Sequence, residues 1–308
     1  MYNDEIKRRY IKEKESTTNM PEGYLERQFN KSEDFENRLK KDISNFTVYE
    51  IGDFYKTLNM RTVESLAVLN SHLSLYTQWC LKRNLVPDCQ NHFAEIVSSS
   101  MVDYINTVAL KKSIITRETL YEWIDDLVNP SDSFIMLALF EGIEGENYCE
   151  IFNLRMSDFE GNKVKLCTGR ELTVSSRLVY WAEKANETLR YYSIASKGER
   201  NFPLLDEDII IKNYPNCTSD DPYQKGKRIY SRVKRNFEAI GVAEYMKPRS
   251  LFDSGKIDYI NSRSKELKIT AKEFIYTQKY AEEVKYRFGY DLQRLRVSFI
   301  KKYGDYLV

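Results

Sequence analysis

Apolar residues recur through most of the chain at steps of three and four positions, the spacing at which side chains share one face of an α-helix. The clearest case opens at Arg61-Thr62 and carries five apolar residues on one face: Leu66, Leu69, Leu73, Tyr76 and Cys80. Comparable patterns predict helices after Thr47 and after Pro222, and over residues 94–110, 116–128, 131–141, 178–192, 250–262, 271–288 and 292–306. The sequence therefore predicts a mainly α protein.

The helical pattern is interrupted between residues 140 and 159. Gly142 and Gly145 form a Gly-x-x-Gly turn that leads into a short helix, and Asn147 stands at the mouth of this turn. Segments with β character follow, and we expect a small antiparallel sheet from residues 164–168 and 170–175, with a further short strand over 209–212.

The pattern also indicates domain boundaries. Lys111-Lys112-Ser113 is the best linker in the chain, so we expect a helical domain over 46–112 and an α-rich domain with the small sheet over 113–308. Residues 1–45 are polar and helical, and we treat them as an N-terminal extension. Its thin apolar stripe of Phe35, Leu39 and Ile43 must be buried against the next domain or a partner subunit.

Composition excludes several classes of protein. The 308 residues are 42% hydrophobic and contain no run of 18 apolar residues, so no membrane span is expected. The charged N-terminus is not a secretory signal, and the five cysteines are scattered without a C-x-x-C pair, so we expect a cytoplasmic protein with reduced thiols. With two histidines and no Walker loop, nucleophile elbow or HExxH motif, no metal or cofactor is expected.

Charge is segregated along the chain although the net charge is only +1. Residues 117–160 hold 11 acidic and 2 basic residues, whereas residues 222–249 hold 8 basic and 2 acidic ones. Arg228, Arg232 and Arg235 share one face of the helix after Pro222, which favours a polyanion as the partner. The alternative is two ordinary solvated helix faces.

The order of these elements resembles the tyrosine recombinases, or phage integrases. The segment E-x-x-N-L-R-M-S-D-F at 150–159 is similar to the SE…LRWxDI helix of that family. The other matching pieces follow in the family's order: the Arg61-Thr62-Val63 helix ending in Trp79-Cys80, the hairpin, Pro248-Arg249-Ser250-Leu251, Phe288-Gly289-Tyr290 and Lys302-Tyr303-Gly304. The resemblance implies a helical, SAM-like core-binding domain followed by a catalytic-type domain.

Family chemistry uses a tyrosine nucleophile, two arginines on the scissile phosphate and a histidine or lysine. Here the first arginine falls on Asn147, or on Glu146 or Tyr148 in a shifted register. The second arginine falls on Phe252, the histidine next to it on Asp253, and the later histidine or tryptophan on Tyr290. Tyr303 lies nearest the position of the nucleophile, and Phe299 and Tyr306 are the alternatives. If the alignment is shifted, Arg249 takes the place of a family arginine. Losing one charge-stabilising group costs a factor of about 10²–10³ in rate. The resemblance therefore implies a recombinase fold that is not an enzyme.

A recombinase fold without its chemistry implies a clamp for duplex DNA. The candidate DNA contacts are Arg249, Lys247, Arg228, Arg232, Arg235, Arg170 on the hairpin, and Lys82 and Arg83 at the end of a core-binding helix. The chain is similar, more narrowly, to the integrase-like repressors that hold SPbeta-group Bacillus phages in lysogeny. This match rests on Asn147, the E-x-x-N-L segment and the R-S-L-F-D-S-G-K-I box.

We therefore expect a sequence-specific DNA-binding repressor that acts on the bacterial nucleoid and forms a homodimer on DNA through its N-terminal helices or its C-terminal tail. A regulatory protein or peptide partner stays open. Two other functions also stay open: an active, divergent integrase that uses Arg249 and Tyr303, and a helical protein-interaction scaffold whose basic helix is merely solvated.

Overall fold

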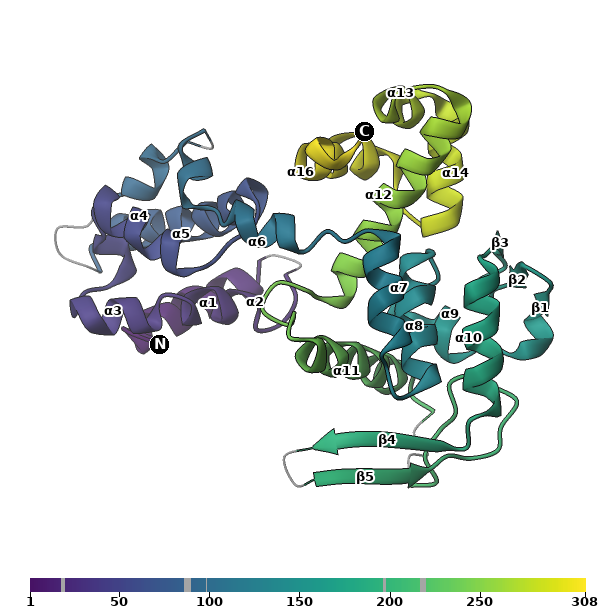
Figure 1. The fold of residues 1–308 in the computed structure, drawn as a ribbon. Coiled ribbons are helices and arrows are strands. Elements are labelled where there is room, and N and C mark those ends of the chain that lie inside the picture. The colour runs from purple at the N-terminus through teal and green to yellow at the C-terminus, as the bar shows by residue number, and fades with distance from the viewer. Residues whose placement is uncertain (18–19, 86–89, 98, 196–197, 217–219) are drawn as a thin grey trace. The chain divides into compact units, whose positions relative to one another are not determined.

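The computed structural model divides into two compact units, Met1–Lys111 and Lys112–Val308, each described by itself (Figure 1). It describes residues 1–17, 20–85, 90–97, 99–195, 198–216 and 220–308. Cys89 and Cys217, two of the five thiols, lie outside these residues. Both units are built mainly from helices, as predicted.

In its described residues, unit 1 has six α-helices. Two of them begin where the sequence predicts. Thr47 accepts a hydrogen bond from the Glu50 N–H in a capping box, and Thr62 accepts one from the Ser65 N–H. The helices are α1 (Asp4–Glu15), α2 (Tyr24–Asn30), α3 (Glu33–Leu39), α4 (Val48–Thr57), α5 (Val63–Arg83) and α6 (Thr107–Lys112). Short 3₁₀ turns lie between α3 and α4 and between α5 and α6.

The core of unit 1 forms around α5. The five apolar residues that define its predicted face are all buried. Phe35 and Ile43 belong to the same core, together with Tyr10, Phe46 and Phe54. Residues 1–45 are therefore part of this unit, and their apolar stripe is buried within the chain.

A buried ion pair joins the first and third helices of unit 1. The Lys7 Nζ lies 2.6 Å from both carboxylate oxygens of Glu36, and neither side chain is exposed. Glu36 also accepts hydrogen bonds from the Ser32 hydroxyl and the Ile43 N–H, at 2.8 and 2.7 Å. Burial raises the pKa of Glu36, and Lys7 opposes this rise. These bonds fix residues 1–45 to the unit by polar contacts as well as by packing.

The continuous helix predicted over 94–110 is wrong. The described part of this stretch forms 3₁₀ turns at His92–Glu95 and Ser100–Tyr104 before α6 begins. The Asn106 N–H donates to the Met60 carbonyl at 2.6 Å, and the Asn106 side chain accepts from the Ala109 N–H at 2.9 Å. Asn106 thus starts a new helix and cannot continue an earlier one.

Unit 2 is organised around α8 (Pro130–Phe140), whose residues 131–140 are all buried. It packs against α7 (Arg117–Asp125), α10 (Ser176–Glu187), α11 (Pro222–Ile240) and α12 (Pro248–Leu267) (Figure 1). Gly255 of α12 permits the close approach of α12 to α8, because a Cβ there would lie 1.7 Å from the Phe140 carbonyl oxygen. The remaining helices are α9 (Cys149–Phe152), α13 (Ala271–Tyr276), α14 (Gln278–Phe288), α15 (Leu292–Arg294) and α16 (Ile300–Tyr303), with a π turn at Leu295–Phe299.

The predicted small sheet is present and has three antiparallel strands in the order β1-β2-β3, with Val164 opposite Leu172. They are β1 (Phe159–Glu160), β2 (Lys163–Lys165) and β3 (Glu171–Thr173). A second hairpin, β4 (Arg190–Ala195) with β5 (Gly198–Pro203), was not predicted. It replaces the end of the helix predicted over 178–192.

Long-range polar contacts explain the differences in this region. The Asn129 carboxamide donates to the Tyr192 carbonyl and accepts from the Tyr192 N–H, both at 2.8 Å, as a neighbouring strand would. The predicted strand over 209–212 is instead a bend. The Ile210 N–H donates to the Leu154 carbonyl at 2.9 Å and the Ile210 side chain is fully buried.

The C-terminal tail docks on its own chain. The Asn261 side chain of α12 donates to the Tyr306 carbonyl at 2.8 Å and accepts from the Val308 N–H at 3.0 Å. The tail is therefore held against α12 of its own chain.

Candidate functional site

The turn before α9 is held in a strained conformation. Gly142 and Gly145 have φ values of +94° and +68°. Asn147 and Tyr148 also lie in the left-handed region, at φ 51° and 63°, which is uncommon for residues with a Cβ. Gly226 of α11 packs on this turn, because a Cβ there would lie 2.3 Å from the Asn147 carbonyl oxygen. The backbone at Asn147 is therefore fixed by α11.

Arg170 and Glu150 form a buried clamp beneath this turn. Arg170 donates from Nε to Glu150 Oε1 at 2.9 Å and from Nη2 to Glu150 Oε2. Its other donors reach the Gly142, Tyr286 and Arg287 carbonyl oxygens. Glu150 also accepts from the Thr168 hydroxyl. The Arg170 guanidinium thus holds the turn, the β2–β3 loop and α14 together, and its predicted contact with DNA stays a prediction.

The beginning of α12 carries a cluster around Asp253, which we call the Asp253 cluster: Asp253, Arg249, Lys256, Lys302 and Tyr303. The Tyr303 hydroxyl donates to Asp253 Oδ2 at 2.7 Å. Arg249 Nε and Lys256 Nζ lie 3.3 and 3.5 Å from Oδ1, and Lys302 Nζ lies 3.9 Å from Oδ2. One carboxylate thus lies among three cations and a phenol, where it balances part of their charge.

Lys256 is fully buried in an aromatic cage. Its Nζ lies 3.6 Å from the centre of the Tyr290 ring and 4.9 Å from those of Phe252 and Phe299, with Phe288 at 5.7 Å. Burial lowers the pKa of Lys256 to about 7, and Asp253 opposes this fall. The cage accounts for Phe252 and Tyr290, two predicted vestigial positions, since both rings contact this ammonium.

Tyr303 is the residue at the nucleophile position that faces the cluster. Its side chain is buried, and burial together with the Asp253 carboxylate raises its pKa. Phe299 supplies a ring of the Lys256 cage, and Tyr306 lies in the tail that docks on Asn261. Arg249 links the cluster to the turn, because its Nη1 lies 3.4 Å from Glu144 Oε2. The structure therefore brings Arg249, Asp253 and Tyr303 together.

The basic face of α11 is only partly available to a ligand. Arg232 is buried and donates from Nε to Asp132 Oδ1 at 2.7 Å and from Nη2 to the Ser131 hydroxyl. Its guanidinium also lies 4.5 Å from the Tyr191 ring centre. The Arg232 guanidinium is thus used inside the protein, and its predicted contact with DNA stays a prediction. Arg235 and Lys247 are exposed, as is Arg249 with 48% of its side chain accessible.

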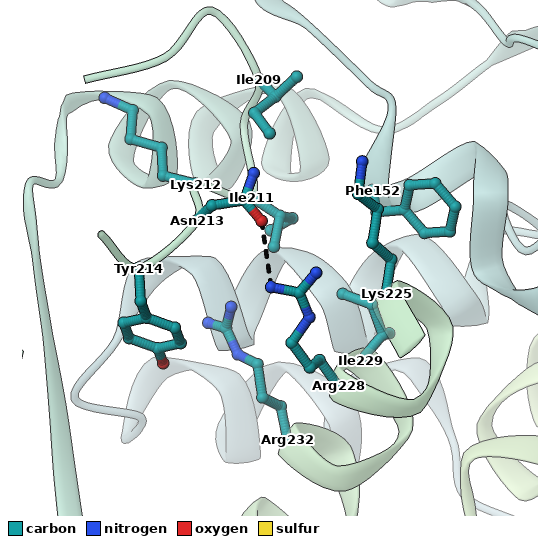
Figure 2. Close-up of a pocket in the computed structure, with 10 residues that line it drawn as sticks. All are labelled: Phe152, Ile209, Ile211, Lys212, Asn213, Tyr214, Lys225, Arg228, Ile229 and Arg232. Atoms are coloured by element: carbon teal, nitrogen blue, oxygen red, sulfur yellow. Dashed lines mark hydrogen bonds between the residues drawn. The ribbon is translucent and has the colours of Figure 1, made fainter. Parts of the chain in front are cut away.

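A small pocket lies beside α11, between this helix and the segment after β5. Figure 2 shows Lys212, Lys225, Arg228 and Arg232 around it, with Arg228 Nη1 donating to Asn213 Oδ1 at 3.2 Å. Lys212 donates to the Asn186 carbonyl and Lys225 pairs with Asp220, at 2.5 and 3.0 Å. The volume of about 40 Å³ holds only a few water molecules. The pocket is therefore too small for a nucleotide, and its four cations have partners within the chain.

The two candidate cations of unit 1 differ. Lys82 is exposed, whereas Arg83 donates to both Glu13 carboxylate oxygens at 2.9 and 3.1 Å and lies 4.6 Å from the Trp79 ring centre. Trp79 donates to Glu13 at 3.0 Å and is buried, so it is a core residue. Arg83 therefore joins α1 to α5.

The carboxylates around the turn have cationic partners. Glu150 pairs with Arg170 and Glu144 with Arg249, while Glu141 lies 3.5 Å from Arg117 and 3.7 Å from Arg287. Within the residues that the structure describes, no group of three or more metal-ligating side chains converges. No described helix is long and apolar enough to cross a membrane.

Comparisons with known proteins agree with this architecture. The model of the MrpR C-terminal catalytic domain matches residues 114–303, and that of the MrpR N-terminal core-binding domain matches residues 1–82. The SPbeta prophage-derived uncharacterized protein YopR of Bacillus subtilis (strain 168) is 25% identical over 272 residues, which cover 83% of this chain and 81% of YopR.

A solved structure has the same arrangement of elements. It is a lambda integrase(75-356) dimer bound to a COC′ core site, and it aligns with a TM-score of 0.51 and 13% identity over 96% of this chain and 94% of that chain. The predicted two-domain, integrase-like fold is confirmed.

Proposed function

The chain belongs to the MrpR family, and from this premise we propose that it binds duplex DNA sequence-specifically, does not cut it, and represses transcription in a lysogenic phage. The integrase-like fold supports a DNA partner, and the SPbeta prophage-derived relative supports a phage role. Catalytic inactivity is argued from the chain's own residues.

One contact carries the proposal: the 2.7 Å hydrogen bond from Tyr303 to Asp253. A scissile phosphate beside Tyr303 would need uncompensated cations around its oxygens. Here the Asp253 carboxylate already lies among Arg249, Lys256 and Lys302, and it would repel a phosphate in the same place. Asn147 supplies no charge where the family has its first arginine. The absence of an arginine beside a transferred phosphoryl group costs a factor of about 10³–10⁵ in rate.

The exposed cations are the proposed DNA contacts. They are Arg249, Lys247 and Arg235 in unit 2 and Lys82 in unit 1; Arg83 is also exposed but pairs with Glu13. Arg232 and Arg170 are left out because their guanidinium groups are used inside the protein. Phosphate contacts of this kind give affinity, whereas specificity needs side chains that reach base edges.

An active, divergent recombinase is the second candidate. The observation in its favour is that Arg249 Nε lies 3.3 Å from Asp253, beside Tyr303 at the nucleophile position. In that function Arg249 would replace a family arginine. The two candidates differ in a single product, a covalent bond between Tyr303 and a DNA 3′-phosphate.

Two measurements test the proposed function. Mapping of bound DNA across the phage and host genomes should find discrete sites next to promoters. Those sites, prepared as nicked duplexes that trap covalent intermediates, are then incubated with the protein and run on denaturing gels, with Tyr303→Phe as the matched control. We expect retention on native gels and no denaturation-resistant band. An adduct that disappears in Tyr303→Phe would show an active recombinase, and binding without discrete sites would contradict a repressor.

A further inference from the structure

Two cysteines meet beside the turn that carries Asn147. Cys149 is the first residue of α9, and Cys167 lies in the loop between β2 and β3. The Cys167 thiol donates to the Cys149 carbonyl oxygen at 3.5 Å. Cys167 is exposed and Cys149 is half-buried. Neither residue has a role in the proposed function.

Noncovalent contacts hold the start of α9 and the β2–β3 loop in position. Glu150, next to Cys149, accepts from Thr168 and Arg170, which flank the loop glycine after Cys167. The Cys149 sulfur is confined on its other side, because a Cβ on Gly145 would lie 2.6 Å from it. These contacts hold Cys167 beside the Cys149 backbone, and a disulfide between the two residues would need an S–S distance of about 2.05 Å.

We propose that Cys149 and Cys167 are a redox-sensitive dithiol that hydroperoxides oxidise to an intramolecular disulfide. The Cys167 thiolate attacks a peroxide oxygen, the O–O bond breaks, and hydroxide leaves, so that Cys167 becomes a sulfenic acid. The Cys149 sulfur then attacks the Cys167 sulfur and displaces hydroxide, which leaves as water with the Cys149 proton. In sum, two thiols and one hydrogen peroxide give one disulfide and two waters.

Exposure determines the order of the two steps. Burial and the neighbouring Cys167 raise the pKa of Cys149 to about 11, so this thiol stays protonated at neutral pH. Because the thiolate is the reactive form, the exposed Cys167 reacts first and Cys149 resolves the sulfenic acid. The disulfide would join the β2–β3 loop to the start of α9, two residues after Asn147.

The sequence makes the test direct, because trypsin leaves each of the five cysteines in a different peptide. Cys149 falls in residues 118–155 and Cys167 in residues 166–170. The reduced full-length protein is treated with one equivalent of hydrogen peroxide, alkylated, and digested without reductant. We expect the two peptides joined with the loss of two hydrogens, at a rate independent of protein concentration, and separated again by dithiothreitol.

Matched variants keep the test falsifiable. In Cys149→Ser, the sulfenic acid on Cys167 should persist, so its capture by dimedone should rise several-fold over the parent. In Cys167→Ser, Cys149 should remain fully alkylatable. The proposal is overturned if the parent forms only intermolecular disulfides, or if Cys167 proceeds to a sulfinic acid while Cys149 stays reduced. No arm of this test uses DNA, so its outcome is independent of the proposed repressor function.

Discussion

The hydroxyl of Tyr303 donates a 2.7 Å hydrogen bond to Oδ2 of Asp253, 50 residues earlier in the chain. Asp253 lies where the recombinase resemblance places a histidine, and Tyr303 lies nearest the nucleophile position. Burial and this carboxylate together raise the pKa of Tyr303, so the phenolate is disfavoured. The contact joins α16 to α12 and gives the tyrosine a structural role.

Tyr303→Phe should leave DNA binding nearly unchanged and lower stability modestly. The variant keeps the buried ring and removes one hydrogen bond to a charged acceptor, which is worth about 1–3 kcal/mol. Urea unfolding measures the decrease, with Tyr306→Phe in the neighbouring tail as the control. A large loss of repression in a variant that unfolds normally would contradict the structural role.

The stability of the protein should rise with pH between about 7 and 9.5 because of Lys256. Burial lowers its pKa from 10.5 to about 7, so over this range the unfolded chain binds a proton that the folded chain does not. One such proton contributes up to about 1.4 kcal/mol per pH unit to the free energy of unfolding. Lys256→Met should flatten this rise, whereas Lys265→Met, an exposed lysine of α12, should not. Equal slopes in both variants, measured by urea unfolding, would exclude this role.

Arg232→Ala should destabilise the protein far more than Arg235→Ala, although both residues lie on one helix. Removing Arg232 leaves the buried carboxylate of Asp132 without its cation, which costs about 3–5 kcal/mol. Arg235 is exposed, so Arg235→Ala should change stability by less than about 0.5 kcal/mol. Thermal and urea unfolding compare the two variants. An Arg232→Ala protein as stable as the parent would show that this guanidinium is available to DNA.

The salt dependence of DNA binding should locate the surface that meets the phosphates. If Arg249, Lys247 and Arg235 each bind one phosphate, replacing any of them with alanine should reduce the salt slope by about one. Arg263→Ala is the matched control, because Arg263 lies near the other end of α12 and pairs with Glu266 and Glu283. Affinity for an isolated operator is measured from low to high salt. If Arg249→Ala and Lys247→Ala both bind as tightly as the parent throughout, the DNA surface lies elsewhere.

Helix beginnings and buried helix faces were predictable from the sequence because they depend on residues a few positions apart. Thr47 and Thr62 cap helices through the next three residues, and the apolar face of α5 follows from its own spacing. The motifs likewise predicted the integrase-like fold. Each motif is a weak match on its own, but all of them occur in the same order as in the family.

The roles of the arginines were not predictable, because they depend on partners far along the chain. Arg232 meets Asp132 across 100 residues, and the Gly142 and Arg287 carbonyls that Arg170 reaches lie 28 and 117 residues away. A helical pattern shows which side chains share a face, but not what covers that face. The β4–β5 hairpin was missed for the same reason, since its pairing with Asn129 is non-local. The buried Lys256 gave no comparable signal, because its neighbours in the sequence include Ser254, Gly255 and Asp258.

The aromatic cage around Lys256 also has an evolutionary consequence. Asp253→His would remove the carboxylate nearest to this fully buried ammonium and leave its charge uncompensated. Phe252→Arg would remove one ring of the cage and add a further cation to a cluster that already holds Arg249, Lys256 and Lys302. Either substitution toward the residues of an active recombinase destabilises the fold before it restores any chemistry. Because proteins lie only slightly above the stability they need, single steps in that direction are selected against. In the proposed non-cleaving function, the surface can therefore diverge freely while the packing around Lys256 constrains these core positions.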